Sequence, residues 1–210
     1  GWMPKKDAVK LPDISEPRQE KEKTRSRVDA LAPKPGYALG YHVPDRGTPE
    51  WYAMGLIDQL LVQGNDSRLY RRLVQDSGIA GELDGGINYL LGNQFDYNGP
   101  MLWSMSFTHD PTHSADQITA TVDEVIEDLR SKPVSTDELE RARTKLRSQL
   151  YSTIDSDGRI GLVNLLAAYA LFDNDPAAIN RIEGGFAQVT PELIQKTAAE
   201  YLRSTNRSIS

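Results

Sequence analysis

Three histidines are the residues of this sequence best suited to metal chemistry, and their spacing decides what they can do. His109 and His113 lie four positions apart, which would present two imidazoles to one metal ion if both stood on a helix. Asp110 and Pro111 interrupt that register, because proline ends a regular helix. We therefore expect His109 and His113 to be loop residues and His42 to be an ordinary strand histidine. The sequence predicts no metal site in this chain.

Other residue types that carry chemistry also lack the patterns that would make them reactive. No serine stands in a G-x-S-x-G turn, no glycine run forms a phosphate-binding loop, and cysteine is absent. The sequence therefore predicts no catalytic residue. A group of acidic residues in the 114–131 segment fits a solvated helix face better than a metal cluster: Asp123, Glu124, Glu127 and Asp128.

Composition excludes two broad classes of protein. The 210 residues carry a net charge of -6, which argues against nucleic-acid binding, because nucleic-acid-binding proteins normally present a basic surface. The sequence has no run of about 18 apolar residues, so we expect no membrane-spanning helix. Gly1 at the start and the stretch 206–210 at the end look like the cut ends of a longer protein, and we expect the last strand to be truncated.

The first 35 residues differ in composition from the rest of the chain. Residues 1–35 are rich in proline and charge and poor in large apolar side chains, which predicts an interdomain connector. Over 22–29, small and apolar residues alternate with arginines. This stretch is either an edge strand with a basic outer face or part of a solvated linker. We expect residues 36–210 to form the folded domain.

Periodicity predicts the first elements of that domain. Alternating side chains predict a strand over 37–43, and an apolar stripe at helical spacing predicts a core helix over 49–63. Two further strands are expected over 79–91 and 100–109.

A short second helix is expected between the core helix and the strand over 79–91. Asp66 or Ser67 can cap its start, and Gly78 can end it, because glycine readily takes the positive φ of a helix C-terminus. Its apolar positions, expected to be buried, are Leu69, Leu73 and Val74.

The second half of the domain reads as a succession of helices. Ser114 with Gln117, and Ser135 with Glu138, form two capping boxes that predict helices over 114–131 and 135–150. Three further helices are expected over 159–172, from Pro176 onward, and from Pro191 to about Arg203. Strands followed by helices indicate an α+β fold, in which a largely antiparallel sheet has helices packed on one face.

Five segments of the sequence combine in an uncommon order. SRLYRRLV is followed three residues later by GIA, and then come GGIN at 85–88, GPML at 99–102, ELERA at 138–142 and the segment 165–176. The residues of these segments and their order resemble the sequence of the C-terminal domain of the pitrilysin/insulinase-type zinc metallopeptidases. The likeness covers roughly residues 37–207. The positions that carry it are Ser67, Arg68, Leu69, Leu73, Gly78, Gly86, Asn88, Gly99, Pro100, Glu138, Leu139 and Ala142.

This resemblance implies a mitochondrial-processing-peptidase-like fold whose chemistry lies outside the present chain. The family binds zinc through a helical H-x-x-E-H segment that is absent here, so zinc is expected in a missing N-terminal half. In related peptidases an arginine and a tyrosine hold the substrate carbonyl, in the pattern L-R-x-K-x-x-L-x-Y. The arginine position falls on Val74 and the tyrosine position on Gly81, and neither side chain can donate a hydrogen bond. Arg71 and Arg72 lie about half a turn or more away and do not replace the arginine.

The function implied by the resemblance is that of a non-catalytic C-terminal domain in a zinc-dependent metalloendopeptidase. Such a domain encloses the substrate chamber and docks on the zinc-bearing half. An alternative is a structural or assembly subunit of the same fold with no peptidase activity. The expected partners are the N-terminal half of the same protein, a homologous partner subunit and a peptide substrate. The resemblance also implies a periplasmic or otherwise extracytoplasmic setting.

Overall fold

A five-stranded sheet forms one side of the domain. The computed structural model describes residue 15 and residues 17–210. In this part of the chain the strand order is β1-β5-β2-β4-β3. Strands β1 and β5 pair in parallel, whereas the other three neighbouring pairs are antiparallel, so the predicted α+β class with a largely antiparallel sheet is confirmed. The strands are β1 (Lys23–Thr24), β2 (Gly36–His42), β3 (Asp84–Ile87), β4 (Leu102–Thr108) and β5 (Arg207–Ile209).

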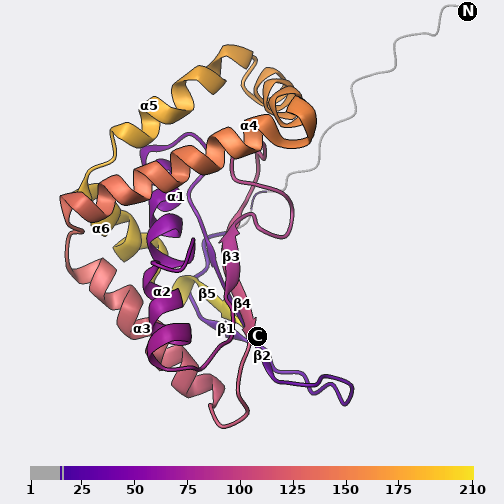
Figure 1. Cartoon of the computed structure of the whole chain (residues 1–210), viewed down its shortest axis with the longest axis vertical. Coiled ribbons are helices and arrows are strands. Elements are labelled where there is room, and N and C mark those ends of the chain that lie inside the picture. Colours follow the sequence, from indigo (N-terminus) through magenta and orange to yellow (C-terminus); the bar gives the residue numbers. More distant parts are fainter. Residues whose placement is uncertain (1–14, 16) are drawn as a thin grey trace, which may run out of the picture.

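The helices gather on one side of this sheet (Figure 1). Short π-helical and 3-10 turns extend α2 over Arg71–Asp76, precede α5 over Pro176–Arg181 and follow α6 over Ser204–Asn206. Within the described residues, no helix combines the length and apolarity needed to cross a membrane. The helices are α1 (Pro49–Leu61), α2 (Arg68–Tyr70), α3 (Ala115–Ser131), α4 (Thr136–Phe172), α5 (Ile182–Ala187) and α6 (Pro191–Tyr201).

Side-chain caps determine where several helices begin. The Thr48 hydroxyl accepts a hydrogen bond from the Trp51 amide at the start of α1. At α3, the Ser114 hydroxyl accepts from the Gln117 amide while the Gln117 side chain accepts from the Ser114 amide, so the predicted capping box is confirmed. Such caps satisfy amides that have no partner in the first helical turn.

Alternation along the strands separates a covered face of the sheet from an open one. Tyr37 pairs with Phe107, Leu39 with Met105 and Tyr41 with Trp103 across β2 and β4. All six side chains are buried. Since successive residues of a strand point to opposite faces, these residues form the face on which the helices pack.

Helix α1 is the centre of the core. It is buried along nearly its whole length, including the polar residues Asp58 and Gln59. A helix that is covered all round needs neighbours on every side, and α1 contacts α2, α4, α5, α6 and β3. The predicted apolar stripe over 49–63 therefore describes only part of its buried surface.

Helix α4 consists of two helices separated by a break at residues 156–159. Asp157, Gly158 and Arg159 have φ values of 49°, 64° and 79°, in the left-handed region. Three successive left-handed residues end a right-handed helix and redirect the chain. The two helices predicted over 135–150 and 159–172 correspond to the two parts of α4.

Three local predictions are wrong. The strand expected over 79–91 extends only over Asp84–Ile87, and the residues around it form turns and a single bridge between Ala80 and His109. Ser67 stands at the start of α2, but its side chain makes no capping hydrogen bond. The Glu138 carboxylate binds Arg68 instead of closing the second capping box.

Two glycines near β3 test how tightly this edge of the sheet is packed. A Cβ added at Gly85 would lie 2.5 Å from the Ser104 backbone oxygen, whereas a Cβ at Gly81 would have no neighbour within 4 Å. We predict that Gly85→Ala lowers the free energy of unfolding by about 1–3 kcal/mol, because backbone must move to admit the methyl group. Gly81→Ala should change it by less than about 0.5 kcal/mol. Urea denaturation of both variants tests this, and equal effects would contradict it.

Candidate functional site

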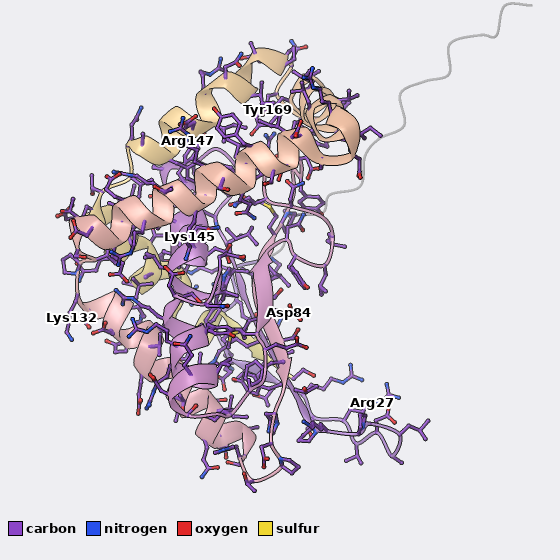
Figure 2. All side chains as sticks on the ribbon, in the orientation of Figure 1. Arg27, Asp84, Lys132, Lys145, Arg147 and Tyr169 are labelled. Atoms are coloured by element: carbon purple, nitrogen blue, oxygen red, sulfur yellow. The ribbon has the colours of Figure 1, made fainter. Side chains whose placement is uncertain are left out.

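The open face of the sheet carries small and hydroxyl-bearing side chains. The register places them together on the side away from the helices, and none of the described helices covers them (Figure 1). Asp84 on β3 and Arg27 in the loop after β1 also lie away from the helical side, where Lys132 and Lys145 are found (Figure 2). Hydroxyl groups can both donate and accept hydrogen bonds, which suits contact with peptide groups. The residues of the open face include Ala38, Gly40, Ser104, Ser106, Thr108 and Ser208, with His42 and Leu102 at one end.

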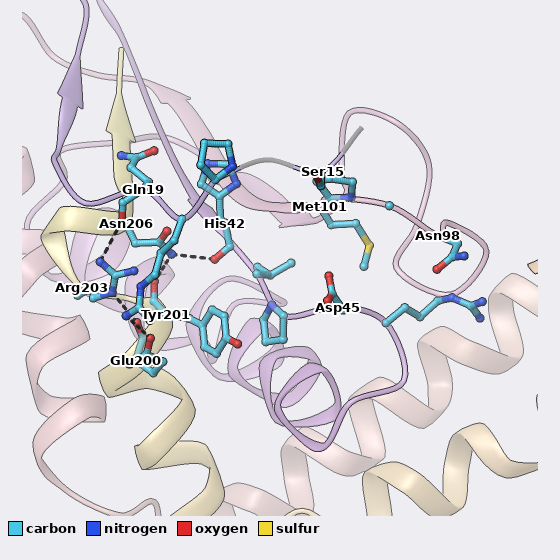
Figure 3. Close-up of a pocket in the computed structure, with 17 residues that line it drawn as sticks. Ser15, Gln19, His42, Asp45, Asn98, Met101, Glu200, Tyr201, Arg203 and Asn206 are labelled. Carbon is cyan, nitrogen blue, oxygen red and sulfur yellow. Dashed lines mark hydrogen bonds and ion pairs between the residues drawn. The ribbon is translucent and has the colours of Figure 1, made fainter. Parts of the chain in front are cut away.

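A polar hollow of about 850 Å³ lies where the connector meets the ends of β2 and α6 (Figure 3). Its arginines are all engaged within the chain, so they offer no preformed site for an anionic ligand. The contacts are Arg18 with Glu200, Arg46 with Asp173, and Arg203 with the Gln19 carbonyl oxygen. We interpret this hollow as part of the surface where the connector packs against the domain.

The connector is fixed to the strand that ends the chain. The Gln19 side chain is buried and donates to the Arg207 carbonyl oxygen at 2.7 Å. The Arg207 guanidinium, which is 5% exposed, binds the carboxylates of Glu22 and Asp123. Strand β1 continues this contact by pairing with β5. Gln19 and Glu22 are thus held against β5 by polar contacts with Arg207, which also binds Asp123 of α3.

Two segments of the family-like pattern meet through one ion pair. Arg68 donates through Nε and Nη2 to the two Glu138 carboxylate oxygens, at 2.8 and 2.9 Å. Its Nη1 donates to Asp128 at 3.1 Å. The planar guanidinium matches a carboxylate in this two-bonded geometry, which fixes distance and angle together. SRLYRRLV and ELERA, which are far apart in the sequence, therefore set the position of α2 against α4.

The remaining positions of the pattern serve packing and turns. Leu69, Leu73, Leu139 and Ala142 are buried in the core. Five others shape the backbone or the loop before β4: Gly78 with φ of 63°, Gly86 with φ of 153°, Asn88 with φ of 57°, and Gly99 and Pro100 at the edge of the connector hollow.

Val74 and Gly81 are the two positions onto which the resemblance places a substrate clamp. Val74 is half-buried against the core, and Gly81 is exposed and open to solvent. Neither side chain has a donor. Among the described residues, no group of three or more histidine, cysteine, aspartate and glutamate side chains is arranged to hold a metal ion. His109 follows β4, and its Nδ1 lies 2.9 Å from the Asp110 carbonyl oxygen, outside any helix.

Asp58 is a buried carboxyl group at the contact between α1 and the sheet. Its oxygens accept hydrogen bonds from Trp103 Nε1 at 2.9 Å and Gln63 Nε2 at 3.0 Å. Burial raises the pKa of Asp58 to about 7, although these hydrogen bonds and the charge of Lys145 act in the opposite direction. Since both oxygens are occupied and the group has no contact with solvent, Asp58 holds α1 on β4 and does not reach a substrate.

Sequence reasoning missed an exposed apolar turn beside the open face. Tyr89, Leu90 and Leu91 are exposed, and they line a second hollow that includes Leu102 and Ser104 of β4. Three consecutive apolar residues do not alternate as the strand predicted over 79–91 requires. Residues 89–91, together with the turn-forming pair Gly92-Asn93, indicate that the strand ends before residue 89.

The sequence of the chain matches a known protein family over more than half of its length. A family model described as the peptidase M16 inactive domain matches residues 2–146. The chain belongs to this family. The resemblance to the pitrilysin/insulinase-type peptidases is thereby confirmed, and the domain is of the inactive M16 type found in proposed zinc proteases. No curated protein matches the chain by sequence.

Solved structures show the same fold. A protease from Helicobacter pylori is 19% identical with a TM-score of 0.80, over 98% of this chain and 47% of that one. A proposed zinc protease from Bordetella pertussis is 26% identical with a TM-score of 0.68, over 88% and 95% of the two chains. The periplasmic protease PqqL from Escherichia coli is 17% identical with a TM-score of 0.66, over 94% and 21%. The chain thus spans about half of the H. pylori protease.

The buried carboxyl of Asp58 makes a prediction about pH. In the unfolded chain this group loses its proton near pH 3.8, whereas the folded M16 domain retains it to about pH 7. Between these values the folded state binds more protons, so its stability falls as pH rises, and the loss is complete above the folded pKa. We predict that the stability of the wild type relative to Asp58→Asn falls by about 2 kcal/mol between about pH 5 and about pH 8.

Denaturation of both proteins across this pH range measures the difference. Asp84→Asn is the matched control, because Asp84 lies on the sheet against which Asp58 packs and is exposed. A difference between wild type and Asp58→Asn that stays constant with pH would contradict the assignment.

Proposed function

We propose that this chain is the non-catalytic C-terminal domain of a zinc-dependent metalloendopeptidase. Its open sheet face encloses one side of the substrate chamber, and zinc is held by the other half of the protein. The observation that carries the proposal is an inactive M16 fold with one uncovered sheet face and no cluster of metal ligands among its described residues. Enclosing a peptide excludes water and strengthens the electrostatic interactions that act on it.

The second part of α4 offers the surface that docks on the zinc-bearing half. Between Arg159 and Asp173 the sequence carries no charged residue. Several large side chains of this stretch lie in solvent, with Ile160 at 55%, Val163 at 62% and Leu171 at 77% exposure. Contiguous apolar patches on soluble proteins mark contact surfaces.

The size of this patch favours a tethered partner over a free one. One side of a helix about 20 Å long presents far less than the roughly 800 Å² per partner of a stable association between free proteins. A half of the same polypeptide is held at high effective concentration, so a smaller contact suffices. The H. pylori protease, of which this chain spans 47%, has the additional length that such a partner requires.

A periplasmic setting is part of the proposal. It is supported by the structural likeness to the periplasmic protease PqqL. The alternative is that the domain serves as a structural or assembly subunit without peptidase activity, and the assay below separates the two.

The proposed function is tested with the zinc-bearing half that precedes this chain, produced alone and joined to it. We predict that the joined protein hydrolyses an unfolded protein substrate with a kcat/KM at least about tenfold higher than the zinc-bearing half alone, because the completed chamber positions and encloses the peptide. This chain alone should show no hydrolysis and hold no stoichiometric zinc by elemental analysis. A joined protein without hydrolysis would support the structural subunit.

The docking surface is tested by Val163→Glu in the joined protein. We predict that this charge separates the halves, seen as a larger radius of gyration in solution scattering, and lowers kcat/KM by about tenfold. Val28→Glu is the matched control, because Val28 is 93% exposed on the loop after β1. Equal behaviour of the two variants would rule out docking through α4.

A further inference from the structure

We propose that the hollow beside residues 89–91 binds one apolar side chain of an extended peptide. The inference rests on the proposed function, since it assigns a substrate contact to the face that lines the chamber. The hollow is about 340 Å³ and lies between the turn after β3 and the start of β4. Tyr89, Leu90, Leu91 and Leu102 supply apolar walls, and Asn88 and Ser104 supply polar atoms.

The apolar side chains of this turn are strongly exposed. Tyr89 is 48% exposed, Leu90 83% and Leu91 72%, and Leu102 on the adjoining strand is 46% exposed. Covering any of these side chains would lower the free energy by about 25 cal/mol for each Å² of apolar surface removed from water. The four side chains surround one hollow, so a single apolar group bound in it would contact all of them.

The turn cannot bury these side chains by folding inward, because both of its ends are anchored. At one end, Asn88 takes a φ of 57°, its amide donates to Leu102 O at 2.8 Å and its side chain donates to Asn93 O at 3.1 Å. At the other end, Phe95 is fully buried, with its ring edge-on to Trp51 and Phe186. The exposure of residues 89–91 is therefore imposed by the fold.

The lining of the hollow selects the kind of occupant. No lysine, arginine, aspartate or glutamate side chain is among its lining residues, which include His42 and are otherwise apolar or uncharged. An apolar group therefore fits these walls better than a carboxylate, which would lose water on entering. The volume is at the lower end of small-ligand pockets, which suits one large side chain and adjacent backbone. The Asn88 and Ser104 side chains can hydrogen-bond with that backbone.

The same dimensions argue against a folded partner. A stable contact between two free proteins buries roughly 800 Å² on each side, much more than the surface of this turn and one strand residue. The hollow also lies on the open sheet face through Leu102 and Ser104, the face that an enclosed peptide would meet. An extended peptide with a leucine- or phenylalanine-like side chain fits size, charge and position together.

The test uses the 210-residue chain labelled with ¹⁵N and two short capped peptides, Ac-Ser-Ala-Phe-Ala-Ser-NH₂ and Ac-Ser-Ala-Asp-Ala-Ser-NH₂. We expect the phenylalanine peptide to shift the amide resonances of residues 88–92 and 102–104 in a saturable manner. The aspartate peptide should bind at least about tenfold more weakly. Shifts of the same size and midpoint with both peptides, or no shift at these residues, would overturn the inference.

Leu91→Asp should weaken the phenylalanine peptide about tenfold while leaving the fold intact, because Leu91 lies in an exposed turn. Leu31→Asp is the matched control, since Leu31 is 93% exposed in the loop after β1, and it should bind as the wild type does. An equal loss in both variants would overturn the inference.

Two further outcomes would assign the hollow to another occupant. Shifts at residues 88–92 that grow with protein concentration alone would identify a second copy of the chain. The same shifts on deletion of residues 1–14 would identify the chain's own first segment. Because the titration measures binding to this chain alone, it can fail while the zinc-bearing half still requires the chain for hydrolysis, which separates this inference from the proposed function.

Discussion

The close packing of α1 on the sheet is the constraint on which the rest of the structure depends. Gly55 lies where α1 meets α5 and the loop before β4, and a Cβ at this position would come within 2.8 Å of the Phe186 ring and 2.9 Å of the Gln94 side-chain oxygen. A helix this deeply buried must be surrounded, and α4, α5 and α6 do so from the side away from the sheet. All the described helices thus pack on one face of the sheet, and none of them covers the other face.

Polar contacts refine this arrangement at three places. Asp58 ties α1 to Trp103 on β4, Arg68 ties α2 to Glu138 on α4, and Arg207 ties β5 to the connector through Glu22. Partly buried ion pairs contribute little net stability, because desolvation offsets their attraction. Their value here is geometric, since each one admits a single relative position of two segments that are distant in the sequence.

The proposed function requires two contact surfaces on this M16 domain. One would meet the zinc-bearing half, and the other would meet the substrate. The two exposed apolar regions, on the second part of α4 and on the turn after β3, are separate features of the fold. Our proposals assign the surface on α4 to the protein contact and the hollow beside the turn to the peptide contact.

The sequence by itself determined the elements whose signals are local. The alternation over 37–43, the capping box at Ser114 and the glycine at 78 each specify a strand, a helix start or a helix end through neighbouring residues alone, and the structure contains all three. The family pattern could also be recognised, because it consists of residue types in a fixed order along the sequence. The fold class followed from the order of strands and helices.

Only the tertiary structure decided which polar groups are buried and which apolar groups are not. Asp58 lies on a helix whose other side chains are mostly apolar, and its burial depends on Trp103, which is 45 residues away. The strand expected over 79–91 extends only over Asp84–Ile87, because Asn88 and Phe95 anchor the following turn to β4 and to the core. Burial is set by contacts between distant segments, and no local periodicity contains that information.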